Sequence, residues 1–205
     1  MIAAALSEVI IGATRFLVGG HARWQGSEPA DGARLYFANH ASHLDSILIW
    51  AALPRWLRET THPAAAADYW GKNAVTRFIS GEVLNAVLID RETVKDPLAP
   101  LRAVLDAGES LILFPEGTRR QERLPAPFKS GLFHLARAYP AVPLIPVYLE
   151  NLARAYPKGA VIPAPISCAV RFGPAMERVE GEEKATFLTR AHAAVCALAG
   201  EEPAL

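Results

Sequence analysis

An imidazole and a carboxylate stand five positions apart in the segment Asn39-His40-Ala41-Ser42-His43-Leu44-Asp45, which follows a short apolar run. Histidine is the side chain best suited to take a proton from a weak hydroxyl nucleophile near neutral pH. A carboxylate on the other ring nitrogen would fix the tautomer and stabilise the imidazolium. His40 is therefore the candidate general base and Asp45 the candidate orienting group. With the hydroxyl of a substrate as the nucleophile, this dyad needs no covalent enzyme intermediate.

The spacing restricts where such a pair can work. Residues five apart in an ideal helix differ by roughly 140° around the axis and do not share a face. We therefore expect a strand-to-helix turn with Ser42 as the N-cap, His40 in the preceding loop and Asp45 at the third helical position, turned back toward His40. Two alternatives stay open. Ser42 and Asp45 could be a capping-box-like pair without catalysis, and His43 is a second candidate base.

A second polar segment, Phe114-Pro115-Glu116-Gly117-Thr118-Arg119, also follows an apolar run. Its glycine permits close backbone approach, Thr118 offers a hydroxyl, and Arg119 offers a planar fork that suits a phosphate. Glu116 would repel a phosphate, so we expect it to orient neighbouring groups. The segment therefore predicts an anion-binding turn.

Two further cations lie at comparable places. Arg91 follows the apolar run that ends in Asp90, and Lys129 lies in the turn Pro127-Phe128-Lys129-Ser130-Gly131. Each has an ordinary alternative explanation, because a basic residue after a strand is usually a solvated surface residue. Arg91 and Lys129 are therefore candidate phosphate ligands only in combination with the other segments.

The order of the segments is the specific signal. An H-x4-D block, a block ending in Asp-Arg, a Phe-Pro-Glu-Gly-Thr-Arg block and an apolar proline-containing strand follow one another, and this order resembles the glycerolipid acyltransferase family. The matching segments are His40 to Asp45, Gly81 to Arg91, Phe114 to Arg119 and Val142 to Val147. The resemblance spans about residues 35 to 150, more than half of the chain. It departs at Asn85-Ala86, where the family often has a glycine.

The resemblance implies an O-acyltransferase that moves a fatty acyl group from acyl-CoA or an acyl carrier protein to a lysolipid hydroxyl, foremost that of 1-acylglycerol 3-phosphate, giving phosphatidic acid. It implies that His40 and Asp45 are the catalytic dyad. The acceptor site implied around the phosphate consists of Arg91, Glu116, Gly117, Thr118, Arg119 and Lys129. No metal and no bound cofactor are implied. A lyso-ornithine lipid or another lysophospholipid as acceptor, a thioesterase-like hydrolase and a catalytically silent lipid-binding module stay open.

The pattern of elements predicts one α/β domain with a mostly buried central sheet flanked by helices. The chain of 205 residues suits a single core. Strands are expected at 33–38, 64–69, 86–90, 110–114, 143–149 and 166–172, and helices at 42–53, 71–80, 97–107, 129–138 and 182–198. The stretch 21–32 is polar, and the proline-rich patch 157–165 is expected to be a surface loop.

The first twenty residues predict an amphipathic helix that ends at its two glycines, ahead of an acyltransferase domain at 21–205. Glu8, Arg15 and the lack of a cleavage pattern argue against a signal peptide or a spanning helix. The helix either covers the core or lies in a membrane interface. Pro54–Arg58, with Trp56 between two arginines, is a second candidate membrane contact. The apolar residues at helical spacing are Ile2, Leu6, Val9, Ile10, Ala13, Phe16 and Leu17, widened by Ile11 and Val18.

Composition excludes other classes. The 21 basic and 21 acidic residues cancel and form no basic run, so nucleic acid is not an expected partner. Cys168 and Cys196 lack metal-ligand or CxxC spacing, which predicts two reduced, buried thiols in a cytosolic chain. We expect an enzyme bound peripherally to the cytoplasmic face of a membrane, with a membrane surface and a lysolipid as partners.

Overall fold

The computed structural model of the chain describes residues 2–42, 44–67, 74–90, 95–156, 164 and 166–200. Seven strands form one sheet in the order β1-β7-β6-β2-β5-β3-β4. The strands are β1 (Gly19–Trp24), β2 (Leu35–Ala38), β3 (Thr61–Ala66), β4 (Val87–Ile89), β5 (Ser110–Leu113), β6 (Leu144–Glu150) and β7 (Cys168–Phe172). The β6–β7 pair is antiparallel and the other neighbouring pairs are parallel. The prediction of a single α/β domain is confirmed.

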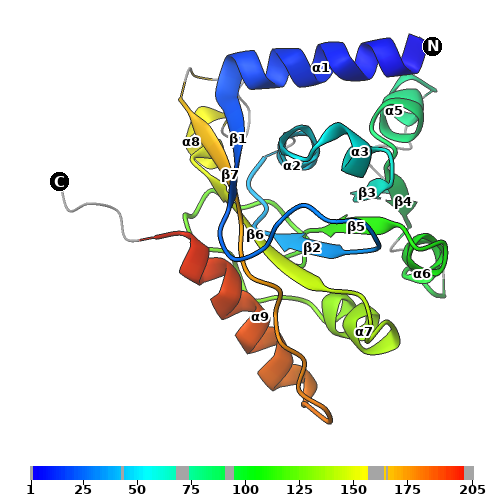
Figure 1. Ribbon diagram of the computed structural model, residues 1–205, viewed down its shortest axis with the longest axis vertical. Coiled ribbons are helices and arrows are strands. Elements are labelled where there is room, and N and C mark those ends of the chain that lie inside the picture. Colours follow the sequence, from blue (N-terminus) through cyan, green and yellow to red (C-terminus); the bar gives the residue numbers. More distant parts are fainter. Residues whose placement is uncertain are drawn as a thin grey trace.

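Helices cover both faces of the sheet. One face carries α1 (Ile2–Val18), α2 (Asp45–Ala52), α3 (Arg55–Arg58), α8 (Leu152–Ala155) and α5 (Ala74–Phe78), which continues into a π-helical turn at Ile79–Val83. The other face carries α6 (Ala99–Asp106), α7 (Gly131–Ala138) and α9 (Lys184–Leu198). Figure 1 shows α1 packed over α2, with α7 and α9 on the opposite side of the sheet.

The central strand β2 is buried on both faces. Its side chains alternate, as a strand requires, so that Tyr36 and Ala38 pack under the α1 and α2 layer and Leu35 and Phe37 pack under the α6, α7 and α9 layer. Both β5 and β6 pair with it. The carboxyl end of β2 is therefore a rigid position from which the next residues leave the sheet.

Most predicted elements agree with the structure within two residues at each end, and the exceptions have physical reasons. The segment Gly19–Trp24, predicted as part of a helix end and a polar stretch, forms β1. It is an edge strand with only partly buried side chains, so its polar sequence gives no strand signal. The strand β3 begins three residues before the predicted start at residue 64.

Several helices also differ from the sequence-based expectation. The helix α2 begins at Asp45 rather than at Ser42. The predicted start of the helix at 71–80 lies outside the described residues, and the described part consists of α5 and the π-helical turn up to Val83. The short helices α3 and α8 were not predicted. Most of the predicted loop at 157–165 lies outside the described residues as well. Both cysteines are unpaired; Cys168 is buried, as predicted, whereas Cys196 is only half-buried.

Only a narrow stripe of the N-terminal helix α1 packs against the rest of the protein. Ile11, Thr14 and Val18 are buried against the rest of the fold, whereas Phe16 is 89% exposed and Val9 is 65% exposed. Of the expected apolar stripe, Val9, Ala13, Phe16 and Leu17 are exposed, whereas Leu6 and Ile10 are half-buried. The residues expected only to widen the stripe, Ile11 and Val18, make the core contact. None of the helices in the described parts of the chain has the length and hydropathy needed to cross a bilayer.

Candidate active site

Asn39 fixes the direction in which the chain leaves β2. Its side chain is buried and bridges to the neighbouring strand β6: the Oδ1 atom accepts the Leu149 N–H at 2.7 Å and the Nδ2 atom donates to the Leu149 carbonyl at 3.3 Å. The next residue, His40, thus starts a loop at the carboxyl edge of the parallel strands. This edge is where α/β sheets place their ligand sites.

His40 and Asp45 are in direct contact. The His40 Nδ1 atom lies 2.6 Å from Asp45 Oδ2, and the Asp45 side chain is fully buried while the His40 side chain is 22% exposed. The carboxylate also accepts the backbone N–H groups of Ala41 at 2.6 Å and of Ser42 at 2.9 Å. Because the carboxylate occupies Nδ1, the tautomer with its hydrogen on Nδ1 presents Nε2 as the proton acceptor.

The predicted N-cap at Ser42 is wrong, although the predicted approach of Asp45 to His40 is present. Leu44 occupies the cap position of α2 and Asp45 is the first helical residue. The Ser42 Oγ atom accepts the Leu44 N–H at 3.3 Å instead of capping Asp45. The carboxylate of Asp45 accepts hydrogen bonds from three donors in residues 40 to 42, and these bonds close a tight loop ahead of the helix. His43, the second candidate base, lies outside the described residues.

The loop that follows β5 holds His40 from the other side. The imidazole stacks on Phe114, with ring centroids 4.4 Å apart and planes at 22°. The His40 N–H donates to Glu116 Oε1 at 2.7 Å, and the His40 carbonyl accepts the Arg120 N–H at 2.9 Å. Ring and backbone of the candidate base are therefore both constrained, which is the arrangement that proton transfer requires.

Glu116 is a buried positioning group. It is 3% exposed, and its second oxygen, Oε2, accepts the Ala126 N–H at 2.8 Å. Burial raises the pKa of the Glu116 carboxyl, while the hydrogen bonds from Ala126 and His40 oppose that rise. Both oxygens bind backbone N–H groups, so Glu116 joins the two ends of its own loop to His40. This placement agrees with the expectation that Glu116 orients its neighbours.

Gly117 and Lys129 meet in the same loop. Gly117 has a φ of 71°, which favours glycine, and a Cβ there would stand 2.7 Å from Lys129 Nζ. The Lys129 N–H donates to the Pro115 carbonyl at 2.8 Å. Thr118 is exposed and Arg119 is half-buried. The absence of a side chain at Gly117 thus leaves room for the Lys129 ammonium against the backbone.

The structure brings most of the predicted residues to one edge of the sheet. His40 contacts both Asp45 and Glu116, and the loop from Gly117 to Lys129 follows directly on Glu116. Arg91 lies outside the described residues, although Asp90 directly follows β4, whose parallel neighbours lead to the same edge. In the described parts of the chain no cluster of three His, Cys, Asp or Glu side chains could hold a metal ion.

Two contributors were missed from sequence. The Phe114 ring stacks against the His40 imidazole. The amide of Asn39 hydrogen-bonds the end of β2 to Leu149 of β6. The β2–β5 register pairs Phe37 with Leu113, so the residues that follow both strands emerge side by side. A signal for Phe114 was thus its place directly after the apolar run, but only the register connects it to His40. No pattern in the sequence predicts the contact between Asn39 and Leu149.

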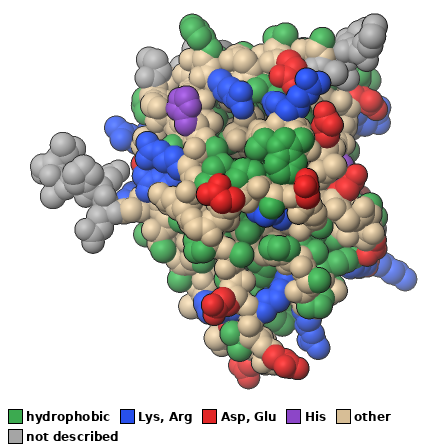
Figure 2. Space-filling model, viewed as in Figure 1, with side chains coloured by type: hydrophobic (Ala, Val, Ile, Leu, Met, Phe, Trp, Pro, Cys, Tyr) green, Lys and Arg blue, Asp and Glu red, His purple; other side chains and the backbone are tan. Residues whose placement is uncertain are grey.

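Charge on the surface is mixed. Figure 2 shows basic and acidic side chains interspersed over one face, with neither sign dominant there. This agrees with the balanced composition of the whole chain. That face lacks the broad basic surface typical of nucleic-acid binding.

Comparisons with known proteins converge on one family. A family model described as Acyltransferase matches residues 22–150. The 1-acyl-sn-glycerol-3-phosphate acyltransferases of Limnanthes douglasii and Cocos nucifera are each 27% identical over 173 residues, which cover 77% and 82% of this chain and 58% and 54% of theirs. The protein of that name from Salmonella typhimurium is 30% identical over 133 residues, 60% of this chain and 51% of the relative. The chain therefore spans a little over half the length of these curated relatives.

The fold is shared with a solved structure. The crystal structure of the 1-acyl-sn-glycerophosphate acyltransferase PlsC from Thermotoga maritima matches with a TM-score of 0.73 at 20% identity. The match covers 95% of this chain and 77% of that one. It therefore includes regions on both sides of the segment that matches the family model.

Proposed function

Since the chain belongs to the acyltransferase family, we propose that it transfers a fatty acyl group from acyl-CoA or an acyl carrier protein to the free hydroxyl of 1-acylglycerol 3-phosphate, giving phosphatidic acid. The observation that carries the proposal is the buried Asp45 carboxylate 2.6 Å from Nδ1 of a partly exposed His40, at the carboxyl edge of the sheet. The names of the relatives support the choice of acceptor.

The proposed reaction runs in two steps without a covalent enzyme intermediate. His40 Nε2 takes the proton of the acceptor hydroxyl while its oxygen attacks the thioester carbonyl, and Asp45 stabilises the imidazolium that forms. The tetrahedral species then collapses, the C–S bond breaks, and the departing sulfur receives the proton from His40. An ester and a free thiol result. We propose that no metal or bound cofactor takes part.

The acceptor's phosphate is placed in this proposal at the loop of Gly117, Thr118, Arg119 and Lys129. This loop is hydrogen-bonded to the backbone of His40 through Glu116 and Arg120. Base and phosphate site are thus parts of one connected unit, and only the short glycerol backbone separates the phosphate from the reacting hydroxyl. Anchoring the phosphate would therefore set the position of that hydroxyl. Arg91 is proposed as a further ligand.

The Arg119→Ala variant should lose kcat/KM roughly ten- to hundredfold with 1-acylglycerol 3-phosphate, because a hydrogen bond to a charged group is lost. An uncharged monoacylglycerol should show a loss of no more than about twofold. Steady-state kinetics with both acceptors measure the difference. Arg137→Ala, an exposed arginine on α7, is the matched control. Equal losses on the two acceptors would contradict the phosphate assignment.

We propose that the chain reaches its acceptor as a peripheral protein on the cytoplasmic membrane face, through the outward side of α1. Phe16, Val9 and Leu17 are 89%, 65% and 45% exposed, and Trp56 on α3 is 46% exposed. Such a face suits the acyl boundary of a bilayer. Of the two arginines beside Trp56, Arg58 does not face outward, because it is buried over the Trp50 ring and pairs with Glu8 at 3.7 Å.

Phe16→Asp should weaken sedimentation with phospholipid vesicles roughly tenfold or more, because burying a phenylalanine contributes about 2 kcal/mol. Turnover of detergent-dispersed acceptor should stay within about twofold of wild type. Val179→Asp, which changes a similarly exposed apolar residue between β7 and α9, is the control and should bind vesicles normally. Loss of binding in both variants, or in neither, would count against a membrane contact through α1.

The acceptor is tested by product analysis. Purified protein would be supplied with acyl-CoA or acyl carrier protein and, in separate reactions, with 1-acylglycerol 3-phosphate, a lyso-ornithine lipid and a headgroup-bearing lysophospholipid. Mass spectrometry should show phosphatidic acid as the preferred product. Preferred acylation of another acceptor would correct the substrate, and no acylated product from any combination would contradict an acyltransferase.

A further inference from the structure

The loop that positions His40 is braced from outside the segment that matches the family model. Residues 114–130 connect β5 to α7, and no helix or strand occurs within this fully described stretch. Its first part is held by His40 itself, through Glu116 and Arg120. Its second part leans on α9, which follows the matched residues 22–150.

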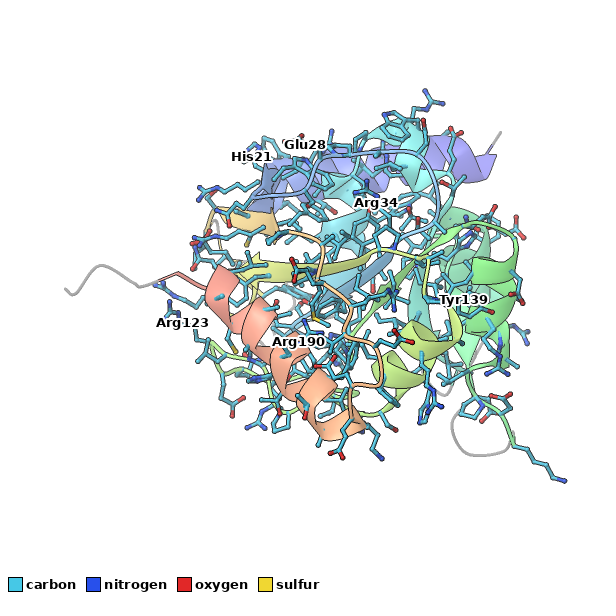
Figure 3. All side chains as sticks on the ribbon, turned by 60° about the horizontal axis from the view of Figure 1, so that its bottom comes forward. His21, Glu28, Arg34, Arg123, Tyr139 and Arg190 are labelled. Atoms are coloured by element: carbon cyan, nitrogen blue, oxygen red, sulfur yellow. The ribbon has the colours of Figure 1, made fainter. Side chains whose placement is uncertain are left out.

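Three contacts fasten that second part to α9. The His192 Nε2 atom lies 2.8 Å from the Pro125 carbonyl oxygen, and the Phe128 ring meets the His192 ring edge-on at 5.3 Å. Arg123 donates to the carbonyls of Ala199 and Gly200 at the end of α9. Figure 3 shows Arg123 beside this end of the helix, with Arg190 farther back along it.

A continuous series of hydrogen bonds connects His192 to the candidate base His40. The Pro125 carbonyl and the Ala126 N–H belong to the same peptide group. That N–H donates to Glu116 Oε2 at 2.8 Å, and Glu116 Oε1 accepts the His40 N–H at 2.7 Å. A donor on the carbonyl side polarises the peptide and strengthens the bond from its N–H. His192, one peptide group and one carboxylate thus lie in series with His40.

The proton positions on His192 follow from its partners. A carbonyl oxygen only accepts, so Nε2 carries a hydrogen and donates it to Pro125. The thiol of Cys196, one helical turn along, lies 3.6 Å from Nδ1 and 3.7 Å from Nε2. Burial, with a smaller effect of the Glu116 carboxylate, raises the pKa of the Cys196 thiol, which keeps it protonated beside the ring. The tautomer with its hydrogen on Nε2 supplies the donor that the Pro125 carbonyl requires.

We infer that His192 is a positioning residue for His40, acting through the Pro125–Ala126 peptide and Glu116. The inference rests on the proposed function for its effect on turnover, since His192 itself touches neither dyad member in this path. Without the donor on Nε2, the bond from Ala126 to Glu116 weakens and the His40 loop gains freedom. A misplaced base loses rate even when the substrates still bind.

The test compares His192→Leu, which removes the donor, with His192→Gln, whose amide can donate to the Pro125 carbonyl. In His192→Leu we expect kcat to fall roughly tenfold or more while both KM values stay within about twofold. His192→Gln should restore most of kcat. His134→Leu, an exposed histidine on α7, is the control. Equal kcat losses in the Leu and Gln variants, or a change in thermal stability alone, would overturn the inference.

A second measurement needs no substrate. Amide hydrogen exchange should show lower protection of the His40 and Ala126 N–H groups in His192→Leu than in wild type and His192→Gln. Unchanged protection of both amides would overturn the inference. A wild-type protein that acylates no acceptor would refute the proposed function, and the exchange result would still decide this contact. Should the leucine variant fail to fold, His192→Asn, whose amide is too short to reach Pro125, replaces it in both measurements.

Discussion

Replacing His40 by alanine should lower kcat for acyl transfer about 1000-fold or more, because the acceptor hydroxyl loses its base and the imidazolium that Asp45 stabilises can no longer form. The fold should persist. The ring is partly exposed, and Asp45 keeps the N–H donors of Ala41 and Ser42. Thiol release with 1-acylglycerol 3-phosphate measures the rate, and thermal unfolding monitored by circular dichroism measures the fold.

The neighbouring histidine provides the matched control for this prediction. His43→Ala removes the second candidate base, three residues after His40, and should retain most of the activity. A His40→Ala protein that is folded and active would remove His40 from the role of base. Loss of activity in His43→Ala alone would transfer that role to His43.

Asp45→Asn should lower kcat by roughly 1000-fold as well, since an amide cannot hold the tautomer that leaves Nε2 as the acceptor. It should also destabilise the fold by about 1–3 kcal/mol. The carboxylate accepts the N–H groups of Ala41 and Ser42 besides contacting His40 Nδ1, and an amide offers one accepting oxygen in place of two. Turnover and urea unfolding of the same preparation separate the two effects.

Ser42→Ala distinguishes catalysis from helix-start stabilisation. It removes the Oγ that accepts the Leu44 N–H but leaves the Asp45 carboxylate in place. We expect a loss of about 0.5–1 kcal/mol in stability with unchanged turnover. If Asp45→Asn behaved in the same way, losing stability but not turnover, the pair would serve only to start α2.

The sequence predicted the strands correctly where a run of apolar residues is buried on both faces of the sheet. The runs in β2, β5 and β6 predicted central strands because both faces of those strands are covered. β1 escaped prediction because an edge strand needs only half of its side chains to be apolar. In α1 the sequence offered apolar residues around most of the helix, and packing of Ile11, Thr14 and Val18 against the protein selected the inward side.

The site was predictable to the extent that it is local in sequence. His40 and Asp45 are five residues apart, so a turn could be inferred to join them. The support around them comes from long-range contacts: Glu116 reaches His40, and His192 reaches Pro125. Glu116 could be expected to orient something, but its partners depend on the strand register. His192 has no spacing signal toward either segment.

In the proposed reaction, acyl transfer to a lysolipid hydroxyl depends on His40 as the base. The most direct test is thiol release from acyl-CoA by wild-type protein and His40→Ala, each with and without 1-acylglycerol 3-phosphate in liposomes. We predict release that requires both the lysolipid and His40. Release by the wild-type protein that is equally fast without lysolipid would contradict the account, because water would then be the acceptor.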